Sequence, residues 1–505
     1  MARYPNAGPL LLKRLSSNTA SSSSQAYTTI RAKATPSKAH LHKPLPSSTF
    51  PKGYLLTGLH AGVKKVSGVP DLALILSTSS NPTTAAACFT RNAFKAAPVV
   101  VSNEVLKENG GYARGVVVNS GCANAVTGKQ GLDDAWNMIK ETDKLLPPAP
   151  SSSSGPFKHE SLVMSTGVIG QNLPISKILA GIQSQSPSAT STRTLSNEFT
   201  AWELAAKAFM TTDTFPKLRS RTFEIGGVQY HMAGMDKGAG MIHPDMGPAG
   251  TTFVGAGKKK ELHATLLGCI LTDAAVSPRS LQKALTYAVD RSFNSISVDG
   301  DMSTNDSIYL LANGAASSSS SLPVIDYQNT PELFNAFQQH LTTFASDLAQ
   351  LVVRDGEGAT KFVTVSVVGA PSYRDAHSIA SRISTSALVK TALYGEDANW
   401  GRILAATGSV PLKGDESIDG LLPPTINPKK VSVTIVPSDG SAPLPVLING
   451  EPEKVNEERA KEIMVQEEFE LLVDLGGIGG GKGEAKYWTC DFSYDYVKIN
   501  GDYRS

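Results

Sequence analysis

One stretch, residues 234–278, constrains the fold most, because it joins a glycine-rich loop to an apolar run near the middle of the chain. It reads GMDKGAGMIHPDM, then a low-complexity insert, then HATLLGCILTDAAVSP. The apolar run begins directly after Ala264 and Thr265. A threonine hydroxyl becomes a good nucleophile when a base takes its proton, and a newly released α-amine on the same residue is such a base. Cleavage before Thr265 is therefore chemically meaningful, although these residues alone also fit an ordinary uncut loop.

The composition narrows the class of protein. With 505 residues, the chain has room for two or three compact units with their own cores. Its 41% apolar and 18% charged content is typical of a globular protein. A formal net charge of +2 predicts no basic surface for nucleic acid. No apolar run approaches the roughly 18–20 residues that a membrane-spanning helix needs.

Metal and nucleotide signatures are weak. The four cysteines are scattered without CxxC spacing, which favours buried free thiols over a disulfide or metal set; they are Cys88, Cys122, Cys269 and Cys490. HExxH and GxSxG motifs do not occur. GGIGGGKG resembles a phosphate-binding loop, but Gly483 stands where the magnesium-binding hydroxyl is needed. We interpret it as a glycine loop and expect no metal site.

The composition of the N-terminal region predicts a mitochondrial or plastid transit peptide, and of the two we predict the mitochondrial form, with the mature protein in the mitochondrial matrix. No acidic residue precedes Asp71, and residues 10–25 read LLLKRLSSNTASSSSQ. Arginine-bearing, serine-rich and acid-free composition is typical of such leaders, whereas the apolar core is too short for a secretory signal. A disordered tail is the alternative. We place the leader at residues 1–40, with removal between about residues 30 and 45.

Helix and strand patterns alternate through both halves, which predicts a mixed α/β protein. Apolar runs at 72–76 and 115–118 predict strands. Residues 161–170, SLVMSTGVIG, are expected to form a strand, a polar turn and a short apolar return. One helix is expected around residues 377–389. Near the C-terminus, KYWTCDFSYDYV is expected to be extended.

Two segments and one histidine are chemical candidates. NSGCANAVTG lies between an apolar strand and a helix, so its backbone amides suit an oxyanion hole. RDGEGATK places Glu357 between two glycines, where its carboxylate could enter a cleft and bind an amino group. An exposed loop acid is the alternative for Glu357. His243 in HPD could be catalytic, but a single loop histidine is more often structural.

Together these segments resemble the ornithine acetyltransferase family, the bifunctional glutamate N-acetyltransferase/ornithine acetyltransferases of arginine biosynthesis. Seven motifs occur in the family order and span residues 51–505, almost all of the chain beyond the leader. They are NSGCANAVTG, STGVIG, KGAGMIHPDM, ATLLGCILTDA, VDGDMSTND, RDGEGATK and YVKINGDYRS.

The resemblance implies a fold and an assembly. It implies self-cleavage between Ala264 and Thr265, giving an α chain of residues 41–264 and a β chain of residues 265–505 that stay associated. It also implies a four-layer αββα sandwich, like that of the N-terminal nucleophile hydrolases but with different connectivity. Two α and two β chains are expected to form a heterotetramer.

The resemblance also implies site roles. Thr265 would be the nucleophile for cleavage and for acetyl transfer, with Thr127 and Gly128 as the oxyanion hole. The residues matching substrate-binding positions are Thr166, Lys237, Thr265, Glu357, Asn500 and Ser505. The implied ping-pong reaction carries acetyl from N-acetylornithine to glutamate without metal or bound cofactor. Acetyl-CoA would be an alternative donor in a bifunctional enzyme.

This sequence departs from the family pattern just before the predicted cleavage site. The family pattern runs from HP-D/N-M directly into Ala-Thr, whereas residues 247–263 intervene here. Gly250-Thr251 is therefore a rival cut site, although Thr265 is preferred because TLLGCILTDA follows it. A self-cleaving N-terminal-nucleophile aminopeptidase or amidohydrolase is the rival enzyme, and an uncut, non-catalytic binding protein is the rival of another class.

Overall fold

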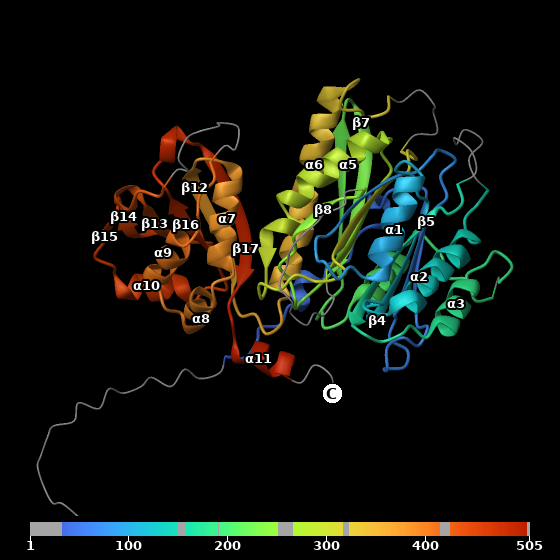
Figure 1. Ribbon diagram of the computed structural model, residues 1–505, viewed down its shortest axis with the longest axis horizontal. Coiled ribbons are helices and arrows are strands. Elements are labelled where there is room, and N and C mark those ends of the chain that lie inside the picture. The colour runs from blue at the N-terminus through green and yellow to red at the C-terminus, as the bar shows by residue number, and fades with distance from the viewer. Residues whose placement is uncertain are drawn as a thin grey trace, which may run out of the picture. The chain divides into compact units, whose positions relative to one another are not determined.

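The structure, a computed structural model, describes residues 33–148, 157–189, 191–250, 266–316, 323–414 and 425–501. All of them belong to the compact unit that begins at Lys33. Three β-sheets organise this unit, and helices cover them (Figure 1).

The first sheet has four strands in the order β1-β2-β4-β5. Its strands are β1 (Tyr54–Leu59), β2 (Leu72–Ser77), β4 (Gly115–Cys122) and β5 (Ser161–Val168). β1, β2 and β4 pair antiparallel, whereas β4 and β5 run parallel. Every residue of β2 is buried, as its continuous apolar sequence predicts for a strand covered on both faces.

The second sheet has six strands in the order β6-β7-β9-β11-β3-β8. Its strands are β3 (Thr84–Thr90), β6 (Lys217–Ile225), β7 (Val228–Lys237), β8 (Met246–Pro248), β9 (Leu267–Thr272) and β11 (Ser307–Ala312). β9 is the apolar run after the predicted cut, and it lies between β7 and β11. Strands from before and after residue 265 therefore pair within one sheet, β7 with β9 and β3 with β11, and their hydrogen bonds would hold the two cleavage products together.

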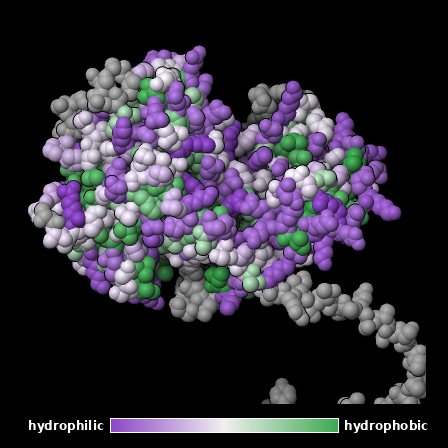
Figure 2. Space-filling view, turned by 180° about the vertical axis from the view of Figure 1, so that it is seen from behind, coloured by the Kyte–Doolittle hydropathy of each residue, from purple (hydrophilic) through white to green (hydrophobic). Residues whose placement is uncertain are grey.

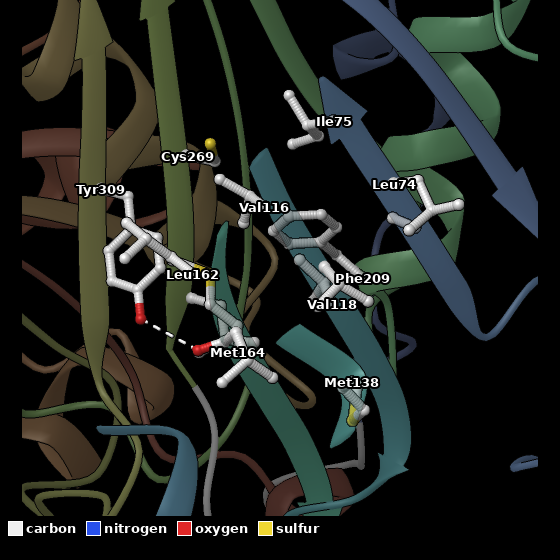
Figure 3. Close-up of a cluster of buried hydrophobic side chains, with 14 of the residues drawn as sticks. Leu74, Ile75, Val116, Val118, Met138, Leu162, Met164, Phe209, Cys269 and Tyr309 are labelled. Atoms are coloured by element: carbon white, nitrogen blue, oxygen red, sulfur yellow. Dashed lines mark hydrogen bonds between the residues drawn. The ribbon is translucent and has the colours of Figure 1, made fainter. Parts of the chain in front are cut away.

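These two sheets pack face to face. Tyr309 of the six-stranded sheet points toward Leu162 and Met164 of the four-stranded sheet, and Cys269 belongs to the same buried cluster (Figure 3). The Tyr309 hydroxyl donates to the Val163 carbonyl at 3.0 Å, so its one polar atom is satisfied inside this apolar layer.

Helices cover the outer faces of both sheets. α1 (Ala97–Glu108) and α2 (Gly128–Asp143) pack on β5, while α3 (Ile175–Gln183) packs on α2. α4 (Phe199–Phe209) differs, because it packs on β1 and β2 and also contacts β6 and β7 of the other sheet. On the other side, α5 (Pro278–Asp290) packs on β3 and α6 (Pro331–Arg354) on β6 and β7. The layers are helix, sheet, sheet and helix, which confirms the expected αββα arrangement.

The third sheet has seven strands in the order β10-β17-β12-β16-β13-β14-β15 and its own hydrophobic core. Its strands are β10 (Ile296–Ser297), β12 (Phe362–Ala370), β13 (Ser432–Pro437), β14 (Leu444–Ile448), β15 (Glu451–Pro452), β16 (Glu468–Asp474) and β17 (Gly483–Cys490). α7 (Tyr373–Ser384) packs on β12 and β17. The remaining helices of this part are α8 (Ala387–Gly395), α9 (Trp400–Gly408) and α10 (Glu457–Met464).

Three local expectations are wrong. β5 continues through Ser165 and Thr166 without a turn, because both residues pair with β4. The helix expected at 377–389 is two helices, since Ser386 caps α8 by accepting a hydrogen bond from the Val389 amide. The C-terminal segment is extended only to Cys490, and α11 (Tyr494–Gly501) follows.

The cysteines agree with the expectation. All four cysteines are buried and none forms a disulfide, as predicted. Within the described ranges, no helix is long and apolar enough to cross a membrane. On the face that Figure 2 shows, hydrophobic residues lie scattered among hydrophilic ones, which is ordinary for a protein surface.

Candidate active site

Lys237 and Thr166 meet between the two facing sheets. Lys237 is the last residue of β7, and Thr166 lies near the end of β5. Both are fully buried, and the Lys237 ammonium donates to the Thr166 hydroxyl at 3.3 Å. In the sheet, Lys237 stands opposite Leu267, two residues after the predicted nucleophile. The structure thus brings two predicted substrate residues to the start of β9.

The Lys237 ammonium is in an unusual electrostatic environment. Burial lowers its pKa, and the carboxylates of Asp213, Glu357 and Asp306 partly offset that effect. Among the described residues, the hydrogen bond of this buried cation goes to a hydroxyl and the carboxylates act on it through charge, so an anion would be a favourable partner for it. Its position suits a ligand carboxylate.

A buried ion cluster holds the loop that begins after Lys237. Lys217 donates to Asp213 and to Asp355, each at 2.6 Å, and all three side chains are excluded from solvent. Asp213 also accepts from the Gly238 amide at 2.8 Å, directly after Lys237. Asp355 lies beyond the predicted cut and the other two before it, so the cluster connects both predicted chains.

Glu357 is buried, with only 6% of its surface exposed, which excludes the exposed loop acid considered above. Its backbone amide donates to the Ala239 carbonyl at 2.8 Å. A Cβ atom at Gly240 would overlap the Glu357 carboxylate, so glycine is needed for this close approach. The carboxylate therefore lies against the KGAGM loop, on the same side as Lys237.

The C-terminal helix reaches this carboxylate. The Asn500 side-chain amide, on α11, donates to Glu357 Oε2 at 2.8 Å. At the other end of α11, the Thr35 hydroxyl donates to Asp495 at 2.8 Å. A residue at the end of the chain therefore contacts a predicted substrate residue from its middle.

The residues predicted to form the oxyanion hole, Thr127 and Gly128, lie at the turn before α2. Asn124 and Val126 have positive φ angles of 49° and 56°, which bend the chain sharply after β4. The Thr127 hydroxyl donates to the Asn124 side-chain oxygen at 2.8 Å, so it must rotate to serve another acceptor. Gly128 begins α2, where the first amides have no intrahelical partner. The geometry is that of an anion-binding helix start.

Two neighbouring residues that the sequence interpretation left without a role, Asn305 and Asp306, join these parts. The Asn305 amide donates to the carbonyls of Ala123 and Ser165, each at 2.7 Å. Asp306 accepts from the Leu266 amide at 3.2 Å, and burial raises its pKa to about 7. Their only sequence signal is the motif VDGDMSTND. This pair ties the oxyanion turn and β5 to the residue that follows Thr265.

Some predicted residues cannot be placed. Ala264, Thr265, Ser505 and most of the insert, including the rival Thr251, lie outside the described residues. The His243 ring and the Tyr487 hydroxyl share a hydrogen bond of 3.0 Å. This bond connects the loop after β7 to β17 of the seven-stranded sheet. In the part of the chain that the structure describes, no group of three or more His, Cys, Asp or Glu could hold a metal ion.

A four-layer α/β sandwich that holds a buried lysine and a buried carboxylate near the ends of its central strands defines the class of an enzyme for small, charged substrates. Comparison with known proteins identifies it further. The ArgJ family model matches residues 55–505. "Arginine biosynthesis bifunctional protein ArgJ, mitochondrial" of Coprinopsis cinerea is 75% identical over 99% of this chain and 100% of its own. The protein of the same name from Laccaria bicolor is 71% identical over 98% and 99%.

Two solved structures are also similar to part of the chain. The Bacillus halodurans argJ protein is 35% identical over 45% of this chain and 95% of its own, with a TM-score of 0.38. Ornithine acetyltransferase from Mycobacterium tuberculosis, complexed with ornithine, is 32% identical over 39% and 95%, with a TM-score of 0.30.

The chain belongs to the ArgJ family. The family resemblance inferred from the motifs is confirmed, and the chain is an enzyme of arginine biosynthesis. The predicted mitochondrial location agrees with its relatives.

Proposed function

We propose that this enzyme moves an acetyl group from N-acetylornithine to glutamate through an acetyl ester on Thr265. The observation that most supports this is the convergence of Lys237, Thr166 and Glu357 at the start of β9. No bound metal or cofactor takes part in the proposed reaction. Acetyl-CoA is proposed as an alternative acetyl donor to glutamate.

The charges of the site match the charges of these substrates. N-Acetylornithine carries a carboxylate and a side-chain ammonium. Lys237 would pair with the carboxylate, and Glu357 with the ammonium, since both are buried and charge-assisted pairs are strong in such places. Asn500 would close the site through its bond to Glu357, and Ser505 would contribute from the same tail.

The reaction has two matched halves. Thr265 Oγ attacks the acetyl carbonyl while its own α-amine takes the hydroxyl proton. The Thr127 hydroxyl and the Gly128 amide stabilise the tetrahedral oxyanion. The C–N bond then breaks, and ornithine leaves with the proton from the α-amine. In the second half, the amine of glutamate attacks the acetyl ester on Thr265. The ester C–O bond then breaks, acetylglutamate leaves, and the threonine hydroxyl is restored.

Self-cleavage between Ala264 and Thr265 is part of this proposal, because it releases the α-amine. Two features support a cut that leaves the chains together: the shared six-stranded sheet and the Asp213–Lys217–Asp355 cluster. A heterotetramer of two α and two β chains is proposed from the resemblance.

The decisive experiment measures both processing and transfer. The purified protein is analysed by intact mass and N-terminal sequencing, and acetylglutamate and free acetate are quantified with N-acetylornithine and glutamate present. Two chains, with the second beginning at Thr265, and acetylglutamate as the main product are expected. Acetate as the main product would favour the rival amidohydrolase, and a single inactive chain would favour the binding protein. Thr251→Ala is the matched control for Thr265→Ala and should still be cut.

A further inference from the structure

A cavity of about 860 Å³ lies beside the residues proposed to bind the amino-acid substrates. Its walls include Lys64 and Lys65 from the β1–β2 loop, Gly167 at the end of β5, and Ile499 of α11. Gly167 follows Thr166 and Ile499 precedes Asn500, so the cavity adjoins the site on two sides. Lys64 also lies within the electrostatic reach of Lys237 and Asp213.

The walls of this cavity favour an anion. The residues with polar side chains that line it are Lys64, Lys65, Gln171, Thr211 and Thr212. No carboxylate is among the described residues that line it. Burial lowers the pKa of Lys64 to about 8, since the charged ammonium is partly desolvated there. An anion in the cavity would compensate that desolvation.

The loop that carries both lysines is held in place by one carboxylate. Asp71 is fully buried and accepts four backbone hydrogen bonds, from Ala61 at 2.6 Å, Gly62 at 3.0 Å, Val63 at 2.7 Å and Lys64 at 3.0 Å. The Lys64 ammonium is fixed by the Pro70 carbonyl at 2.7 Å. The basic wall is therefore formed in advance, which lowers the entropic cost of binding.

The size of the cavity favours a large anion over the carboxylate of an amino acid. Pockets of about 300–1,000 Å³ hold drug-sized ligands, so this one exceeds what an amino-acid carboxylate needs. Apolar side chains such as Val63 and Ile499 also line it, beside the lysines. A ligand with both an anionic part and a long uncharged part fits this mixture.

We propose that this cavity binds the phosphate-bearing arm of an acyl-thioester donor, acetyl-CoA, and directs its acetyl group toward Thr265. This inference rests on the proposed function, because it supplies the second donor for the same threonine. The bond between Thr265 Oγ and the acetyl carbon forms, and the carbon–sulfur bond breaks. The proton of the threonine hydroxyl passes through the Thr265 α-amine to the departing thiolate.

The test uses the purified full protein and the charge reversal Lys65→Glu, because Lys65 is exposed and lines the cavity. Its KM for acetyl-CoA, with glutamate as acceptor, should rise by about tenfold or more, whereas the KM for N-acetylornithine should stay within about twofold. Lys65→Arg should behave as the unchanged protein. Lys107→Glu, on the exposed side of α1, is the matched charge reversal away from the cavity.

Acetyl-pantetheine, which lacks the nucleotide phosphates, separates the anionic arm from the thioester. Lys65→Glu should leave its KM unchanged. An unchanged KM for acetyl-CoA, or an equal rise with both donors, would overturn the assignment of the cavity. Unchanged protein that uses N-acetylornithine but not acetyl-CoA would overturn this inference alone. Use of neither donor would refute the proposed function itself.

Discussion

Replacing Lys217 by methionine probes the buried cluster beneath the site. Methionine keeps most of the side-chain length but removes the ammonium that Asp213 and Asp355 share at 2.6 Å each. Neither carboxylate can turn to solvent, because both side chains are buried. The variant therefore leaves two carboxylates without their cation.

The expected cost follows from that burial. Removing one partner of a buried ion pair costs about 3–5 kcal/mol. For a protein of this size, that loss corresponds to a fall in Tm of roughly 3–5 °C, because the entropy of unfolding grows with chain length. Lys207→Met is the matched control: Lys207 pairs with Glu203 on α4 but is 39% exposed, so about 0.5 kcal/mol or less is expected. Calorimetry on both purified variants gives the comparison.

The pH dependence has a definite sign. Burial opposes ionisation of Asp213, but Lys217 and Lys237 outweigh it and hold its pKa well below the usual range. Its stabilising effect is therefore present above the unfolded pKa, about 4, and is lost as the pH falls through the folded value. Without Lys217, burial raises the pKa of both carboxylates, so the destabilisation should be larger at pH 8 than at pH 5.

A second variant tests the cause. Lys217→Met combined with Asp213→Asn and Asp355→Asn removes the uncompensated charges. This triple variant should regain part of the lost stability, and the added pH dependence should disappear. A loss below about 1 kcal/mol for Lys217→Met, equal at both pH values, would refute the reasoning.

Four further predictions concern the site. Thr265→Ala should leave one uncut, inactive chain by intact mass, and normal processing would contradict its role. Asn500→Ala should lose about 1 kcal/mol of binding, raising KM for N-acetylornithine about fivefold with kcat little changed; an unchanged KM would exclude the contact with Glu357 from binding. Gly240→Ala should displace the Glu357 carboxylate and raise the same KM, at about 1–3 kcal/mol of overpacking, whereas normal kinetics would mean that Glu357 can move away freely. Because the folded pKa of Asp306 is raised to about 7, the unfolding free energy should fall by about 4 kcal/mol between pH 4 and 7, and Asp306→Asn should flatten that slope in melting curves; an equal slope would contradict this.

Local patterns predicted much of the fold correctly. The apolar runs of β2, β4 and β9 are visible in the sequence, because a strand buried inside the protein needs a short continuous run of apolar residues. The glycine- and asparagine-rich turn before α2 is visible for a different reason: glycine and asparagine adopt positive φ angles more readily than most residues do.

Local patterns failed where a distant partner decides the conformation. Thr166 looked like part of a polar turn, yet pairing with β4 keeps it in the strand. The C-terminal segment looked extended, yet α11 forms where Asn500 meets Glu357. Asp306 gave no signal of its own, because its importance comes from accepting the Leu266 amide across 40 residues.

The sequence by itself therefore determined the family, the motifs and the alternation of helices and strands. It also indicated Ala264-Thr265 as the bond to test. Only the tertiary structure decided that Lys237, Thr166 and Glu357 gather at the start of β9, and that a lysine-lined cavity adjoins them. The physical reason is that hydrogen bonds between distant strands and the burial of charge are set by residues far apart in the chain, which no local period records.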